Sequence, residues 1–134
     1  METNLIYKKE SFEIVGAAME VHNILGCGFS EPAYQEAFEF ELKERKIPYI
    51  RERYYPIKYK DNKLSKNFRV DFECYGKILV ELKAVEDFKT EFFIQTYNYL
   101  KASGLKLALL INFGKPSLQT KRLVRKEYWD KNDY

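Results

Sequence analysis

The sequence is poor in the residues that build thiolate metal sites, disulfide frameworks and histidine-dependent catalytic sites. Its two cysteines, Cys27 and Cys74, are far apart and fit no CxxC spacing, so we expect neither a zinc site nor a disulfide. The single histidine, His22, has no nucleophile motif beside it, which argues against Ser-His-Asp and Cys-His catalysis. We expect His22 on a helix surface or at a helix end. No glycine-rich loop follows a predicted strand, which argues against a nucleotide-binding fold.

Long apolar runs and flexible linkers are also absent from the sequence. No stretch approaches the roughly 20 apolar residues of a membrane span, and the first residues carry charges where a secretory signal is apolar. No repeat or low-complexity segment suggests a domain boundary. With 134 residues, of which 46% are hydrophobic and 16% aromatic, the chain can bury a core of its own. We therefore expect a single soluble, cytoplasmic domain over residues 1–134.

The net charge is small, which argues against a histone-like polycation. The formal charge is +3, so charge alone identifies no partner. Five basic residues gather near the C-terminus, either as a phosphate-binding cluster or as an ordinary solvated face: Lys115, Lys121, Arg122, Arg125 and Lys126.

Hydrophobic periodicity predicts eight elements. Ser11 and Ser30 are the candidate caps of two amphipathic helices, and Pro56 places its strand at a sheet edge or at a break. The helices are expected at 11–25, 30–46 and 91–103, and the strands at 53–59, 64–74, 77–85, 105–113 and 116–125. The order is α-α-β-β-β-α-β-β. A right-handed crossover makes the strand at Leu107 parallel to that at Leu79, giving an α/β fold with helices around a mixed sheet.

Charged residues interrupt two of the apolar strands. Glu81 and Lys83 are two apart on a strand and share a face, while Val80 and Leu82 point to the other side. If the preceding hairpin turns about Gly76, residues whose numbers sum to 152 lie opposite each other. Asp71 then faces Glu81.

Two opposed carboxylates repel, and a divalent cation reverses this effect. At about 5 Å and an effective dielectric of about 20 the repulsion is roughly 3 kcal/mol. Magnesium accepts oxygen ligands and keeps several waters, so Asp71, Glu81 and the backbone carbonyl of Leu82 are the candidate metal ligands, with Lys83 beside them. The alternative is an ordinary cross-strand salt bridge between Lys83 and one of the two acids.

Three further residues are candidates for the same site. Gln95 and Tyr99 are four apart on the predicted helix and share a face, where they can reach a water or a phosphate. Taken alone, they are equally well explained as a solvated amide and a core aromatic. Glu31 lies in the first turn of the second helix, where helix electrostatics already favour an acid.

The sequence resembles the GxxExxY proteins of the PD-(D/E)xK nuclease superfamily. The name-giving motif matches at Gly28, Glu31 and Tyr34. The similarity covers roughly residues 12 to 125 and continues through 69–72 (RVDF), 80–84 (VELKA), Gln95 with Tyr99-Leu100, and 110–114 (LINFG). Val70 replaces the proline of the PD signature. Phe92 stands where relatives often have a histidine.

The resemblance implies a restriction-endonuclease-like fold with Asp71 and Glu81 as metal ligands and Lys83 as the catalytic lysine. It also implies active-site roles for Glu31 and for the pair Gln95 and Tyr99. The expected activity is Mg²⁺- or Mn²⁺-dependent hydrolysis of phosphodiester bonds in DNA. Two alternatives are a non-catalytic module of the same fold that binds nucleic acid or a protein, and a homodimer that uses exposed tyrosines as interface anchors.

Overall fold

The computed structural model describes residues 5–128 and contains the eight expected elements in the expected order. The helices are α1 (Lys8–Leu25), α2 (Glu31–Glu44) and α3 (Thr90–Ser103). The strands are β1 (Tyr49–Tyr59), β2 (Asn62–Cys74), β3 (Ile78–Lys83), β4 (Leu107–Asn112) and β5 (Gln119–Val124), followed by a 3₁₀ turn at Lys126–Tyr128. In the described range no helix is long and apolar enough to cross a membrane.

The five strands form one mixed sheet in the order β1-β2-β3-β4-β5. Neighbouring strands are antiparallel except β3 and β4, which are parallel and joined through α3. The predicted parallel pairing is therefore confirmed. Every residue of β4 is buried, as its continuous apolar run predicted.

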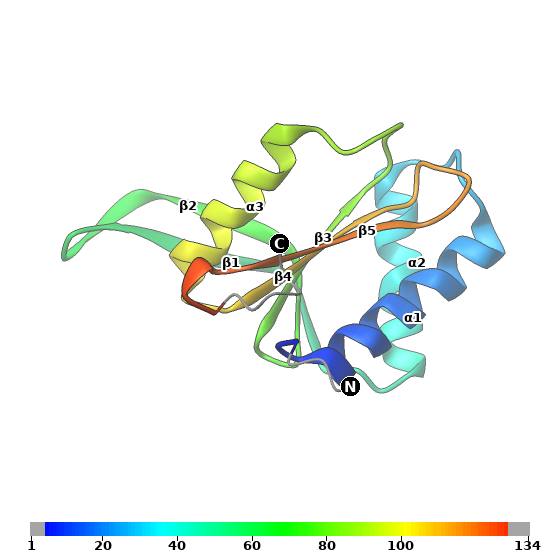
Figure 1. The fold of residues 1–134 in the computed structure, drawn as a ribbon, viewed down its shortest axis with the longest axis horizontal. Helices are drawn as coiled ribbons and strands as arrows, with labels where there is room; N and C mark the ends of the chain where they lie inside the picture. The colour runs from blue at the N-terminus through cyan, green and yellow to red at the C-terminus, as the bar shows by residue number, and fades with distance from the viewer. Residues whose placement is uncertain (1–4, 129–134) are drawn as a thin grey trace.

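Helices cover the sheet on both faces (Figure 1). On one face α1 and α2 pack on the sheet through a large apolar cluster that includes Ile14, Phe38 and Val80. On the other face Leu100 of α3 packs with Leu79 of β3 in a smaller cluster. The predicted α/β fold, a restriction-endonuclease-like mixed sheet between helices, is confirmed.

One local prediction for α1 was wrong, and a second, for His22, is only partly met because His22 lies in the last turn of the helix but is buried. The helix begins at Lys8 rather than at Ser11, whose hydroxyl instead donates to the carbonyl of Tyr7 inside the first turn. His22 is buried rather than on the surface, and its Nε2 lies 2.8 Å from the carbonyl oxygen of Lys115. Ser30 does occupy the N-cap position of α2, but its side chain makes no capping hydrogen bond.

The β1–β2 hairpin extends away from the rest of the molecule (Figure 1). Strand β1 lies at the edge of the sheet, and the pairing register shifts between Pro56 and Lys58. Both outcomes predicted from the proline are confirmed. Beyond this shift, the hairpin ends in a turn at Lys60 and Asp61.

Candidate functional site

Strand β3 carries Glu81 and Lys83 on the face that is turned toward α3. Ile78, Val80 and Leu82 all pack into the cluster beneath α1 and α2, so the residues between them point to the opposite side. Glu81 is only 7% exposed, whereas Lys83 is half-buried. The Nζ atom of Lys83 lies 4.5 Å from the centre of the Phe92 ring on α3.

The β2–β3 hairpin brings Asp71 to the same place. Phe72 pairs with Val80, so the hairpin register predicted from Gly76 is confirmed. Regular strand pairing ends at that pair, and there Asp71 contributes its side chain instead. Its Oδ2 accepts a hydrogen bond of 2.8 Å from the backbone amide of Leu82.

The strand geometry is irregular at Asp71. Val70 packs in the cluster on the α3 side, whereas Phe72 packs in the cluster on the α1 and α2 side. Residues two apart on a regular strand share a face, so the alternation is interrupted between them. On β1, Glu52 lies between the partners of these two residues and has a left-handed φ of 54°. The irregularity therefore affects both strands and leaves Asp71 buried beside β3.

The carboxyl groups of Asp71 and Glu81 interact directly. Burial raises the pKa of Glu81 well above its usual range, and the charge of Asp71 and a hydrogen bond to Asp71 raise it further. Lys83 opposes this rise and Glu31 adds to it. Glu81 therefore retains its proton to higher pH than an exposed glutamate, because a second negative charge beside Asp71 is costly in a desolvated place.

The N-terminus of α2 adds a third acid. Glu31 is half-buried, and burial raises its pKa; the Lys83 charge lowers this pKa and the Asp71 charge raises it. Glu31 is therefore within electrostatic reach of both groups. The preceding loop is fixed by Tyr34, whose hydroxyl donates to the Gly26 carbonyl and whose ring stacks on Phe113 with centroids 4.6 Å apart.

Helix α3 contributes the predicted pair of Gln95 and Tyr99. Burial raises the pKa of Tyr99, and the nearby charges of Glu81 and Asp71 raise it further. A hydrogen bond from Gln95 acts in the opposite direction. The Tyr99 ring stacks on Phe68 of β2 with centroids 4.4 Å apart, which fixes the phenol at the edge of the carboxylate pair.

All six side chains expected at the site thus converge on one region between β2, β3, α2 and α3. Two neighbouring residues had no predicted role there. Phe92 supports the Lys83 amine, and the fully buried Asn112 fixes the chain that leaves β3. The Oδ1 of Asn112 accepts from the amides of Val85 and Gly114, and its Nδ2 donates to the carbonyl of Val85 and to Gln119. The resemblance placed Asn112 in a motif but gave it no role.

The donor set is suited to a hard divalent cation. Asp71 and Glu81 are two carboxyl groups that disfavour each other without a counter-charge. The amide of Leu82 points toward β2, and the carbonyl of Lys83 accepts from Phe113 on the β4 side. Since neighbouring residues of a strand alternate in direction, the Leu82 carbonyl also points toward β2. Within residues 5–128 no three His, Cys, Asp or Glu side chains form a complete metal cluster, so water would have to supply further ligands.

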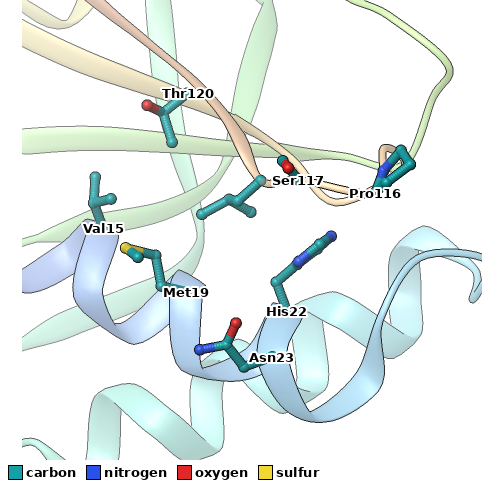
Figure 2. A pocket seen from close by; sticks show the side chains of 8 residues that line it. Val15, Met19, His22, Asn23, Pro116, Ser117 and Thr120 are labelled. Atoms are coloured by element: carbon teal, nitrogen blue, oxygen red, sulfur yellow. The ribbon is translucent and has the colours of Figure 1, made fainter.

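A separate pocket lies on the other face of the sheet. It measures about 400 Å³ between α1 and the segment that precedes β5 (Figure 2). Met19, His22 and Asn23 border it from α1, and Ser117 and Thr120 border it from the opposite side. None of the six predicted site residues lines this pocket.

The C-terminal basic cluster is largely engaged within the molecule. Arg122 donates to the carbonyl of Ile6 over 2.6 Å and to the hydroxyl of Ser11. Lys115 pairs with an aspartate and Arg125 with a glutamate. These contacts favour the structural interpretation of the cluster over the phosphate-binding one.

Comparisons with known proteins bear on the fold and the family. A family model described as the PD-(D/E)XK nuclease superfamily matches residues 8–124. A crystal structure of a protein named SSO0001 is similar to this chain, with a TM-score of 0.55 and 18% sequence identity. The match covers 88% of this chain and 60% of that protein, and at this identity it supports the fold alone. None of the curated proteins compared with the chain matches it.

Proposed function

Because the chain belongs to the PD-(D/E)XK nuclease superfamily, we propose that it is a Mg²⁺- or Mn²⁺-dependent nuclease that hydrolyses phosphodiester bonds in DNA. We further propose that it belongs to the GxxExxY proteins, on the motif formed by Gly28, Glu31 and Tyr34. The observation that carries the proposal is the buried contact between the carboxyl groups of Asp71 and Glu81. As a purely structural feature it costs stability, whereas a bound cation makes it favourable.

We assign the metal ligands to Asp71, Glu81 and the backbone carbonyl of Leu82. Two carboxylates and a carbonyl leave several coordination positions for water, as Mg²⁺ requires. When bound, such an ion lowers the pKa of a coordinated water and stabilises negative charge on a phosphoryl oxygen. Ionised Asp71 and Glu81 are the form that binds a cation, so activity is expected to rise with pH as Glu81 loses its proton.

Lys83 is the proposed catalytic amine. Its Nζ faces the π surface of Phe92, a contact that orients the ammonium group without neutralising its charge. The ammonium hydrogens remain able to donate to a phosphate oxygen or to orient the attacking water. Phe92 has no titratable proton, so a histidine-assisted step at this position is not part of the proposal.

Glu31 and Tyr99 complete the proposed site at its edges. The raised pKa of Glu31 allows it to exchange a proton closer to neutral pH than an exposed glutamate, and its proximity to Lys83 suits it to orient that amine. The raised pKa of Tyr99 keeps its phenol protonated at neutral pH. With Gln95, it is a hydrogen-bond donor for a phosphate or a bound water.

A nuclease assay tests the proposal directly. Pure protein would be incubated with single-stranded, double-stranded and branched DNA in the presence of Mg²⁺ or Mn²⁺. The Glu81→Gln and Lys83→Met variants are expected to lose at least about 100-fold in cleavage rate, the scale of removing one group that stabilises transition-state charge. Glu86→Gln, which removes an exposed carboxylate shortly after β3, is the matched control and should cleave normally.

The outcomes separate the enzyme from its alternative. If the wild type cleaves none of the substrates, or if Glu81→Gln cleaves as fast as the wild type, the nuclease proposal fails. Calorimetry with Mn²⁺ adds an independent measurement, because binding should disappear in Glu81→Gln. A protein that neither cleaves DNA nor binds Mn²⁺ would be the non-catalytic module.

A further inference from the structure

The β1–β2 hairpin carries an unusual share of the positive charge of the chain. Residues 51–69, which we call the basic arm, contain seven lysines and arginines but only two acids. The arm therefore has a net charge of +5 in a chain whose net charge is +3, and the remaining residues together are slightly acidic. The part of the molecule that projects from the body is thus the part most strongly attracted to a polyanion.

The basic residues of the arm fall into two groups. Near the body, each arginine is paired with a glutamate, at distances of 2.8 to 3.3 Å: Arg51 with Glu39, Arg53 with Glu73, and Arg69 with Glu52. Farther out, Lys58, Lys60, Lys63 and Lys66 are all exposed. None of these four lysines is paired with a carboxylate in the part of the chain that the structure describes.

Cross-strand pairing in the arm places like charges opposite each other. Lys58 pairs directly with Lys63, so their side chains share a face of the ribbon. Like charges at directly opposed positions destabilise a hairpin, although solvent weakens the effect. Stability therefore gives no reason for this arrangement, whereas an anionic ligand across both lysines does.

One face of the arm is free to receive such a ligand. Tyr55 and Ile57 pack with the cluster beneath α3, so the adjacent Tyr54 points to the other face and is 57% exposed. The register shift leaves a hollow of about 260 Å³ on this hairpin, bordered by Tyr54, Lys63 and Asn67. Exposed lysines grouped on one projecting hairpin form the kind of basic surface that contacts the phosphates of a nucleic acid.

The arm is continuous with the strand that carries the candidate site. Lys63 precedes Asp71 by eight positions along β2, and the register shift sets four steps of β2 against two of β1, so the two residues are at most about 26 Å apart at about 3.3 Å per residue. At about 3.4 Å per nucleotide along one strand of a duplex, this reach spans roughly eight base pairs. A DNA molecule with a phosphate at Asp71 is therefore long enough to meet the outer lysines.

We propose that the basic arm binds the phosphate backbone of DNA about one helical turn or less from the bond at the candidate site. This inference rests on the proposed function for its choice of DNA as the polyanion. It assigns backbone contacts to Lys58, Lys60 and Lys63, in place of the engaged C-terminal cluster. The contacts position the substrate and take no part in the chemistry.

Fluorescence anisotropy on a labelled 24-base-pair DNA duplex tests the arm without requiring cleavage. The titrations are made in EDTA at 50 to 200 mM salt. The test variant replaces Lys58, Lys60 and Lys63 with glutamine, and the matched control replaces the exposed Lys8, Lys43 and Lys101. A third variant has arginine at the three arm positions. Equal melting temperatures verify that all variants fold.

The salt dependence gives the decisive readout. Removing three phosphate contacts should make the slope of log K against log salt shallower by about 3, which reduces the salt-induced loss of affinity over this range by roughly 40-fold. The arginine variant and the control triple should keep the wild-type slope. If the arm and control triples have the same slope, the arm does not bind the backbone.

The experiments distinguish failure of the arm proposal from failure of the nuclease proposal. A shallower slope in the arm triple together with no cleavage by the wild type would support the arm and refute the nuclease. Cleavage by the wild type together with an unchanged slope in the arm triple would support the nuclease and refute the arm. Anionic lipid vesicles provide a competing polyanion, and arm-dependent binding to vesicles but not to the duplex would overturn the choice of DNA.

Discussion

Replacing Glu81 with glutamine should stabilise the metal-free protein at neutral and alkaline pH. Glu81 is buried beside the Asp71 carboxylate, and its pKa is raised by burial and by the Asp71 charge. Two unit charges 4–5 Å apart repel by about 3–4 kcal/mol at an effective dielectric of about 20. Retention of the Glu81 proton and the attraction of Lys83 reduce this cost, so we expect a gain of about 2 kcal/mol.

The sign of the effect depends on pH. A folded-state pKa above the unfolded value means that the contribution of Glu81 to stability is fully present below about pH 4.5. This contribution is lost as the pH rises through the raised folded-state pKa. The wild type and Glu81→Gln should therefore melt at similar temperatures at pH 4. At pH 8 in EDTA the variant should melt about 5–10 °C higher, given roughly 3–5 °C per kcal/mol for a chain of this size.

A divalent cation should reverse the order of stability. At a Mn²⁺ concentration of about 100 times the dissociation constant, binding stabilises the wild type by about 2.7 kcal/mol and leaves the variant almost unchanged. Differential scanning fluorimetry with and without Mn²⁺ measures both effects. If Glu81→Gln melts lower than the wild type at pH 8 in EDTA, the carboxylate pair is not a source of strain and the reasoning is refuted.

Glu73 provides a matched control for this experiment. Glu73 is also a buried carboxylate and lies on β2, the strand next to that of Glu81, but it accepts hydrogen bonds from Arg53 and from the hydroxyl of Tyr55. Removing its charge leaves these partners less well satisfied, so Glu73→Gln should destabilise the protein by about 1–3 kcal/mol. If Glu81→Gln raises the stability and Glu73→Gln lowers it, the stabilisation at Glu81 comes from removing repulsion by its acidic neighbour rather than from neutralising a buried group.

Three further substitutions test the scaffold around the site by thermal or chemical unfolding. Gly114→Ala should lower the free energy of unfolding by about 3 kcal/mol, because the new Cβ would lie 2.3 Å from the carbonyl oxygen of Val85. The control, Gly16→Ala in helix α1, should be neutral or slightly stabilising. An equal loss of stability in the two variants would contradict this steric argument. Asn112→Ala should cost about 2–4 kcal/mol through four lost hydrogen bonds, and a cost below 1 kcal/mol would contradict their importance. Tyr34→Phe should cost about 1 kcal/mol by releasing the loop before α2, which protease digestion of that loop would detect; unchanged digestion would argue against this role.

The fold and much of the site geometry were predictable because their signals are local. The turn at Gly76 fixes which residues face each other across the β2–β3 hairpin, and the pair of Phe72 with Val80 follows from it. The period of two along β3 then places Glu81 and Lys83 on one face. Near Asp71 the alternation fails, because Glu52 on the neighbouring strand adopts a left-handed conformation that is rare for glutamate and that no sequence pattern predicts.

The features that prediction missed depend on contacts between distant segments. His22 is buried because it meets the carbonyl of Lys115, which is 93 positions away in the chain. Asn112 links the ends of β3 and β4 through its hydrogen bonds to Val85. From sequence alone, an asparagine at the end of an apolar strand is equally consistent with an ordinary turn residue. Ser11 lies inside helix α1 rather than at its N-cap, because its hydroxyl can be satisfied within the helix by donating to the carbonyl of Tyr7, four residues earlier.

The hydrogen bond from the Leu82 amide gives Asp71 a structural role in addition to its proposed role as a metal ligand, and this complicates the interpretation of Asp71 variants. The same carboxyl group that carries charge also closes the gap where two strands stop pairing. An alanine here would remove an acceptor from a buried amide and loosen the sheet, so inactivity of that variant would say little about chemistry. Asparagine keeps a carbonyl oxygen at the same reach, which makes Asp71→Asn the substitution that separates loss of charge from loss of structure.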